Sequence, residues 1–209
     1  MAEADTSQGS RKRRYHHGDL REALIEATRE LLIEKGADGF TLSDACRRAG
    51  VSTAAPYKHF RDKSEILEEI VEGGFDDLTK RSMEAVQANG PGTLAGIVAM
   101  GHAYIAFAVA ETAVFRLMFG QSSAVKRAED VENKGRACFA GVIAQVELYC
   151  QRNAVPGDAK KIALELWTFV HGASCLVIDK DYDKVAPGLD VPSLITEVTP
   201  KLLDVRPSQ

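Results

Sequence analysis

The sequence lacks the usual marks of a secreted, redox-active or catalytic protein. Its four cysteines lie far apart in apolar helical patterns and form no CxxC pair. We therefore expect buried thiols in a reducing compartment, with a redox sensor as the alternative. No apolar run follows the polar and then basic N-terminus, so no signal peptide is expected. There is no nucleophile–base motif and no glycine-rich phosphate loop, and we expect no catalytic site and no cofactor.

Strand patterns and internal repeats are also missing. Every long segment has the helical period, so the 209-residue chain is expected to be all-α, as one large domain or two modest ones. Leu94 to Ala110 is an uncharged run of 17 residues. It is short for a bilayer and contains His102, which favours a helix buried in a soluble core. We expect no membrane contact and a cytoplasmic protein.

Positive charge is scarce overall but concentrated near the N-terminus. The net charge of −4 argues against a general nucleic-acid binder. However, residues 11–63 carry a net charge of +4, whereas residues 64–209 carry −6. This asymmetry suits a protein that touches phosphate with one end only.

A helix-turn-helix pattern occupies TLSDACRRAGVSTAAPYKHFRDK, which runs from Thr41 to Lys63. Thr41 can cap a first helix that ends at Gly50, because glycine adopts the left-handed conformation readily. Ser52 can then cap a second helix over about residues 53–59. Two short helices joined by a glycine-containing turn are typical of proteins that place the second helix in the major groove of DNA.

A compact basic run directly precedes the first helix. As an arm it would lie along DNA phosphates or in the minor groove, and the alternative is a solvated tail. Its residues are Arg11, Lys12, Arg13 and Arg14.

About nine helices are predicted along the chain. The first strong break after the helix-turn-helix is Asn89–Gly92, so the helix before it would link an N-terminal head to a C-terminal helical bundle. Besides the helix-turn-helix, the predicted helices cover about 19–35, 62–86, 93–111, 113–119, 128–153, 158–179 and 191–203.

The segment GVSTAAPYKHFRDKSEIL resembles the helix-turn-helix signature of the TetR family of bacterial transcriptional regulators. ELWTFVHGAS further resembles the Trp and His-Gly ("WHG") signature of one subgroup's regulatory domain. The resemblance implies an all-helical homodimer that binds a palindromic operator in double-stranded DNA and is released by a small molecule. It implies a basic arm over residues 1–17, a DNA-binding domain over 18–65 and an effector-binding and dimerisation domain over 66–209.

The resemblance also implies which residues meet DNA. Tyr57 and Lys63 match the family's phosphate contacts, Phe60 its core anchor, and the small side chains of the second helix limit direct base reading. Pro56 departs from the common pattern and sits about one turn into that helix. The predicted DNA-binding residues are Thr41, Arg47, Ser52, Thr53, Ala54, Ala55, Tyr57, Lys58, His59 and Lys63.

The C-terminal helices supply candidates for an effector pocket and a dimer interface. The pocket candidates, with His102 as the polar handle for a mostly apolar ligand, are Phe75, His102, Tyr104, Phe107, Phe115, Phe119, Phe139, Trp167 and His171. The helix of residues 158–179 is apolar on two faces, of which one can pack within its own domain and the other against a partner chain. The predicted interface is Ile162, Leu166, Phe169, Ala173, Leu176, Leu194, Val198 and Leu202.

Two metal patterns are incomplete. His171 and Cys175 lie on one helical face but make only two ligands. Asp179, Asp181 and Asp183 imitate the start of a calcium loop that lacks its glycine, so a surface loop and no metal are expected.

Three functions remain open at this point. The first is a repressor released by a small, largely apolar effector, associated with the nucleoid. The second is a regulator or activator without a small ligand. The third is a helical binding protein with weakened DNA affinity, suggested by Pro56 and the modest basic charge.

Overall fold

The computed structural model describes residues 17–120, 122, 125 and 129–203, and the predicted arm of Arg11 to Arg14 lies outside them. Within these residues the fold is all-helical, with no strand. The elements are α1 (His17–Lys35), α2 (Leu42–Arg48), the short 3-10 turn η1 (Pro56–Lys58), α3 (Lys63–Asn89), α4 (Leu94–Ala110), α5 (Thr112–Phe119), α6 (Glu129–Asn153), α7 (Ala159–Ile178), α8 (Asp181–Val185) and α9 (Val191–Leu203).

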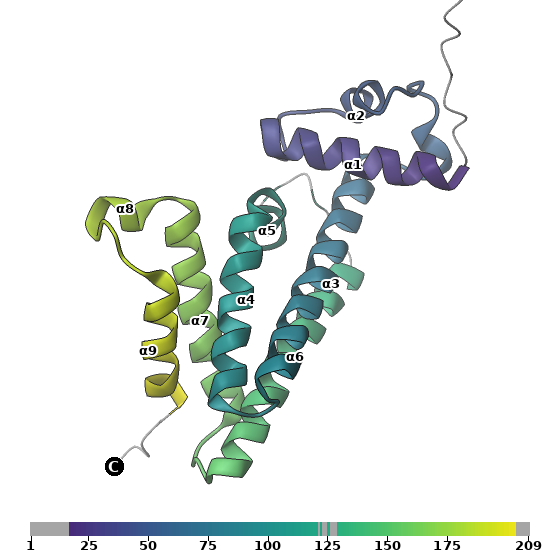
Figure 1. Ribbon diagram of the computed structural model, residues 1–209. Helices are drawn as coiled ribbons and strands as arrows, with labels where there is room; N and C mark the ends of the chain where they lie inside the picture. The colour runs from purple at the N-terminus through teal and green to yellow at the C-terminus, as the bar shows by residue number, and fades with distance from the viewer. Residues whose placement is uncertain (1–16, 121, 123–124, 126–128, 204–209) are drawn as a thin grey trace, which may run out of the picture.

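The N-terminal head consists of α1, α2 and η1, and lies across one end of the long helix α3 (Figure 1). The predicted cap of α2 is confirmed: the Thr41 hydroxyl accepts from the Asp44 amide, and the Asp44 carboxylate accepts from the Thr41 amide. Gly50 is left-handed (φ 69°), and the Val51 amide closes the helix end on the Cys46 carbonyl. These local bonds fix where α2 starts and stops.

The prediction of an α-helix as the second helix of the helix-turn-helix is wrong. Residues 53–59 contain only the 3-10 turn Pro56–Lys58 rather than an α-helix. The Ala55 amide bonds to the Ser52 carbonyl, but Pro56 has no amide hydrogen with which to continue the ladder. Proline also disfavours the helical conformation of the residue before it.

The body is a bundle in which α3, α4, α6 and α7 run side by side, with α9 at the outer edge against α4 and α7 (Figure 1). Asp62, Thr93 and Asp158 cap α3, α4 and α7, since each side chain accepts from an amide in its helix's first turn. Helix α9 continues through Pro200 rather than ending there. The five-residue helix α8 was not predicted, because it has no buried residue and hence no apolar period.

One hydrophobic core runs from the head into the body. It includes Leu24 and Phe60 from the head, Phe75 from α3, and Phe107 and Phe115 from α4 and α5. A smaller cluster lies at the far end of the bundle around Val146. Helix α7 is long and apolar enough to cross a membrane, but here it packs against α4, α6 and α9 as a core helix does.

Candidate nucleic-acid interface and effector cavity

The turn after α2 presents a row of small and polar side chains to solvent. Ser52, Thr53, Ala54, Tyr57 and Lys58 are exposed, and Ala55 and His59 are half-buried. The Tyr57 ring is 67% exposed, whereas the Phe60 ring, three residues on, is only 3% exposed. An exposed tyrosine beside a buried phenylalanine separates a side chain that can meet a partner from one that anchors the segment.

The two arginines at the end of α2 have different environments. Arg48 donates to Glu30 (2.9 Å) and Glu34 (2.7 Å), so it joins α2 to α1. Its hydrogen bond to Glu34 lowers the pKa of that carboxyl. Arg47 has a 78% exposed side chain with a single ion pair, to Asp44 in its own helix (3.1 Å). Arg47 is thus the more accessible of the two to a phosphate.

Arg61 is a candidate that the sequence analysis missed. Its side chain is 86% exposed and follows the turn of residues 52–59, and it pairs with Glu65 (3.3 Å). The sequence carries no distinctive signal for Arg61, because a charged residue outside the apolar pattern looks like any other surface residue.

Lys63 takes part in the internal structure of the head. Its ammonium donates to the carbonyls of Ala37 and Phe40, both at 2.8 Å, and lies 4.6 Å from the centre of the Phe40 ring. These contacts tie the start of α3 to the loop that precedes α2. A phosphate contact by Lys63 is untested, and the structure supplies another role for the same charge.

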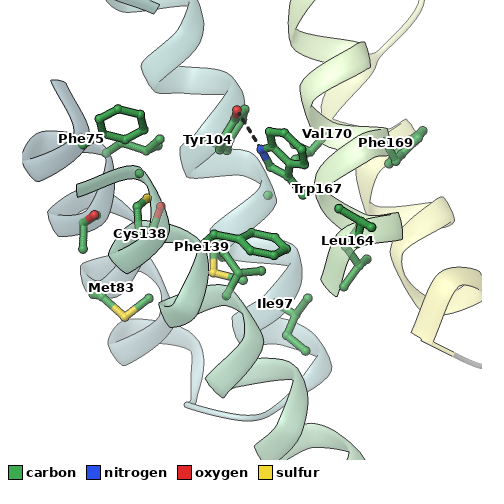
Figure 2. A pocket seen from close by; sticks show the side chains of 18 of the residues that line it. Phe75, Met83, Ile97, Tyr104, Cys138, Phe139, Leu164, Trp167, Phe169 and Val170 are labelled. Atoms are coloured by element: carbon green, nitrogen blue, oxygen red, sulfur yellow. Dashed lines mark hydrogen bonds between the residues drawn. The ribbon is translucent and has the colours of Figure 1, made fainter. Parts of the chain in front are cut away.

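The body encloses a cavity of about 400 Å³ between α3, α4, α6 and α7, shown in Figure 2. Its lining is almost wholly apolar. Among the pocket candidates, the structure brings together Phe75, Tyr104, Phe119, Phe139 and Trp167. Further lining residues that the sequence analysis did not name include Met83, Ile97, Met100, Cys138, Val142 and Leu164.

Four pocket candidates lie elsewhere. Phe107 and Phe115 are core residues, 0% and 2% exposed. The predicted polar handle His102 lies outside the cavity, where its Nε2 is 3.1 Å from the Pro192 carbonyl oxygen and so ties α4 to α9. His171 does not line the cavity but contacts the wall from behind, with its ring centre 4.8 Å from that of Phe119.

Near α5, the side chains of Trp167, Tyr104 and His171 form a line of polar groups at the cavity wall. The indole N–H of Trp167 donates to the Tyr104 hydroxyl (3.3 Å), which lies 2.9 Å from His171 Nδ1. Burial raises the pKa of Tyr104 and lowers the pKa of His171. Burial likewise raises the pKa of the Cys138 thiol. All three groups are therefore uncharged at neutral pH.

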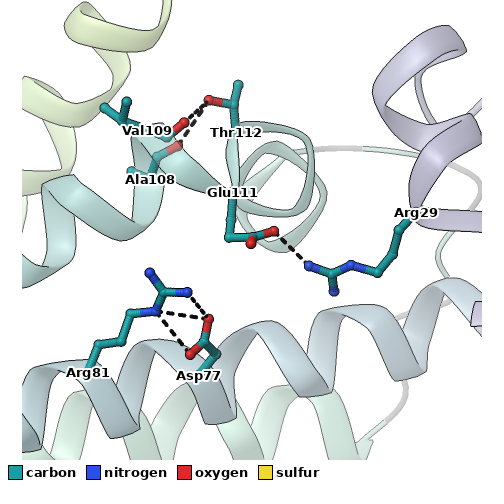
Figure 3. A network of polar contacts seen from close by, with 7 residues as sticks. All are labelled: Arg29, Asp77, Arg81, Ala108, Val109, Glu111 and Thr112. Carbon is teal, nitrogen blue, oxygen red and sulfur yellow. Dashed lines mark hydrogen bonds and ion pairs between the residues drawn. The ribbon is translucent and has the colours of Figure 1, made fainter. Parts of the chain in front are cut away.

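Helix α5 connects the cavity to the head. Phe119, at its C-terminal end, lines the cavity, while Glu111 at its N-cap pairs with Arg29 of α1 at 2.6 Å (Figure 3). Next to this pair, Arg81 and Asp77 bond within α3. The Glu111–Arg29 ion pair therefore connects α5 directly to α1 of the head.

The predicted dimer residues divide into two groups. Ile162, Leu166 and Ala173 are 1%, 8% and 3% exposed inside their own protomer, so they are removed from the interface prediction. Leu176 is 39% exposed. The others are partly exposed along α7 and α9: Phe169, Leu194, Val198 and Leu202.

The metal patterns have other uses in the structure. Cys175 Sγ lies 3.8 Å from His171 Nε2, Asp179 pairs with Arg116, and Asp181 pairs with Lys184. No group of three metal-ligating side chains occurs within the part of the chain that the structure describes.

A head that carries a helix-turn-helix, joined by a long helix to a helical body, is the architecture of a class of DNA-binding regulators. Residues 24–70 match the family model "Bacterial regulatory proteins, tetR family", and residues 97–194 match "Tetracyclin repressor-like, C-terminal domain". A solved structure of a protein of unknown function from Rhodococcus sp. RHA1 is similar over 92% of this chain and 97% of that one, with 32% identity and a TM-score of 0.79.

Curated relatives match over a shorter part of the chain. The Escherichia coli transcriptional regulator BetI is 39% identical over 66 residues, which is 32% of each chain. The Brucella suis transcriptional repressor BepR is 33% identical over 61 residues, 29% of each. The match thus spans about a third of these relatives' length. The chain belongs to the TetR family of transcriptional regulators, which are DNA-binding proteins and not enzymes.

Proposed function

We propose that the protein is a homodimeric repressor that binds a palindromic operator and is released when a small, largely apolar effector fills the cavity of the body. The observation that carries this proposal is the apolar cavity of about 400 Å³, a size suited to small organic ligands, with α5 running from its wall to the head. The name of BepR, a repressor, is consistent with this sign of regulation. The site of action is the cytoplasm, at the nucleoid.

The proposed DNA contacts are the exposed residues of the head. The turn from Ser52 to His59 would enter the major groove, with Thr53 and Lys58 offering hydrogen bonds to bases. Thr41, Arg47 and Tyr57 would meet phosphates, and Arg61 joins them. With few base-reading side chains, DNA shape would carry much of the specificity.

The proposed dimer uses the partly exposed apolar residues of α7 and α9. Phe169, Leu176, Leu194, Val198 and Leu202 remain on the surface of the protomer, so a second copy could cover them. With the two-fold axis along α7, this arrangement would place both heads at the same end of the assembly.

The test is selection of DNA from a random pool with the purified full-length protein at near-physiological salt. Enrichment of a palindrome with half-sites about one helical turn or slightly more apart is the expected result. Weak, salt-sensitive binding with no enriched sequence would contradict it. The enriched operator then serves to screen small apolar molecules for release.

A further inference from the structure

The polar line on the cavity wall has a defined direction of hydrogen bonding. The Trp167 indole can only donate, so the Tyr104 hydroxyl oxygen accepts at 3.3 Å. The single hydrogen of that hydroxyl is then free for His171 Nδ1, 2.9 Å away. Neutral His171 accordingly carries its own proton on Nε2, which faces Cys175 Sγ. This assignment leaves the Tyr104 oxygen with one unused lone pair.

The line of polar groups meets the cavity at Tyr104 and Trp167. Tyr104 and Trp167 line the space, whereas His171 does not. In Figure 2 the dashed Tyr104–Trp167 bond lies at one end of the lining, with Phe139 beside Trp167 and with Met83 and Ile97 farther away. A ligand here would meet apolar surface along most of its length and a hydrogen-bond acceptor at one end.

No unbalanced charge lines the cavity within the described residues. Its single charged lining residue, Arg136, has a 64% exposed side chain paired with Glu132 at 3.2 Å. The same guanidinium donates to the Asn133 side chain. An ionised ligand would lose its hydration without gaining an opposite charge, which disfavours it strongly.

We propose, building on the effector cavity proposed above, that the ligand is a neutral, largely apolar molecule with one hydroxyl group, a phenol or alcohol, that donates to the Tyr104 oxygen. The cavity distinguishes such a molecule from its ether by the hydrogen bond and from its acid by charge. Tyr104, rather than the surface-lying His102, is then the polar handle.

The experiment uses Trp167, the single tryptophan of the chain, which reports occupancy by its fluorescence. Three probes share one skeleton: para-pentylphenol, para-pentylanisole and para-pentylbenzoate. The phenol is expected to bind about five-fold more tightly than the anisole, the size of one net hydrogen bond. The benzoate is expected to bind more than about ten-fold more weakly than the phenol.

Tyr104→Phe should abolish or reverse the preference for the phenol, because it removes the acceptor and frees the Trp167 N–H. Ser82→Ala is the matched control: it removes another hydroxyl from the lining, and the preference for the phenol should persist. Far-ultraviolet circular dichroism of both variants shows whether they are folded.

Equal binding of phenol and anisole to the wild type would overturn the assignment of Tyr104. Tightest binding by the benzoate, lost in Arg136→Gln, would overturn the neutral cavity. Binding by none of the probes would refute this inference while leaving operator selection, which needs no ligand, as it stands. Expected probe preferences without release of the operator would instead refute the proposed function.

Discussion

The head and the body use polar groups in opposite ways. In the head, charged side chains are satisfied internally: Arg48 joins two glutamates, and Lys63 holds two backbone carbonyls. In the body, the cavity wall is mostly apolar, its Tyr104 hydroxyl and Cys138 thiol are uncharged, and its single charged lining residue, Arg136, is mostly exposed and paired with Glu132. Because the core of the head is small, ion pairs and hydrogen bonds of this kind help to hold its exposed, DNA-facing residues in place. A larger core can leave part of its interior empty for a ligand.

The largest expected effect separates anchoring from reading within the head. Phe60→Ala removes a ring that is 3% exposed and should lower the free energy of unfolding by about 3–5 kcal/mol. Tyr57→Ala, at a ring that is 67% exposed, should change it by less than about 0.5 kcal/mol yet weaken operator binding. Urea unfolding and operator titration measure the two quantities. Equal losses of stability would erase the distinction.

Gly74→Ala tests how tightly the helix that carries the head is packed on α5. A Cβ there would lie 2.7 Å from Met118 Sδ and 2.8 Å from Val114 Cγ1, which should cost about 1–3 kcal/mol. Gly73→Ala is the control, since its Cβ meets nothing within 4 Å; it should stabilise the helix by about 0.5–1 kcal/mol. Thermal unfolding of the pair gives the answer, and opposite signs are required.

Lys63→Met sharpens the comparison by separating a positioning charge from a DNA-contacting charge. Loss of its two carbonyl bonds should lower the free energy of unfolding by about 1–3 kcal/mol, with the salt dependence of operator binding unchanged. Arg61→Ala should leave stability within about 0.5 kcal/mol but reduce the slope of log affinity against log salt by about 1. A reduced slope for Lys63→Met would restore its phosphate contact.

A small effect on stability is expected at the junction between head and body. Glu111→Gln breaks a partly exposed pair with Arg29 and should cost about 0–1 kcal/mol. It should nevertheless shrink the ratio of operator affinities measured without and with effector. Arg116→Gln, which breaks the pair between α5 and α7, is the control and should leave that ratio intact. An unchanged ratio in Glu111→Gln would exclude the pair from the coupling.

Much of the fold follows from local chemistry in the sequence. The helix ends are set by side-chain caps such as Thr41 and Asp62 and by glycines such as Gly50, so their positions could be predicted. Residues 53–59 read as an α-helix from Ser52, a residue type that often caps helices, but Pro56 limits the segment to a 3-10 turn capped at Ala55 without a side-chain bond.

The cavity could be predicted only in part. Phe115 and Phe119 lie four residues apart on α5, and periodicity turns both inward. Only the three-dimensional packing decides that the first is surrounded by protein atoms and the second borders an empty space. For the same reason, His102 could not be told apart from a ligand-binding histidine: its partners lie on α9, about 90 residues away.

Helix α5 has Phe119 at the cavity and Glu111 against the head, and any coupling that it carries between the two sites must be reciprocal. An effector that weakens operator binding about ten-fold must itself be held about ten-fold more weakly by the protein on DNA. Extra operator copies in a cell, by holding more of the protein on DNA, would therefore raise the effector concentration at which half of the protein is occupied. The sensitivity of the switch is a property of the number of its binding sites as well as of the cavity.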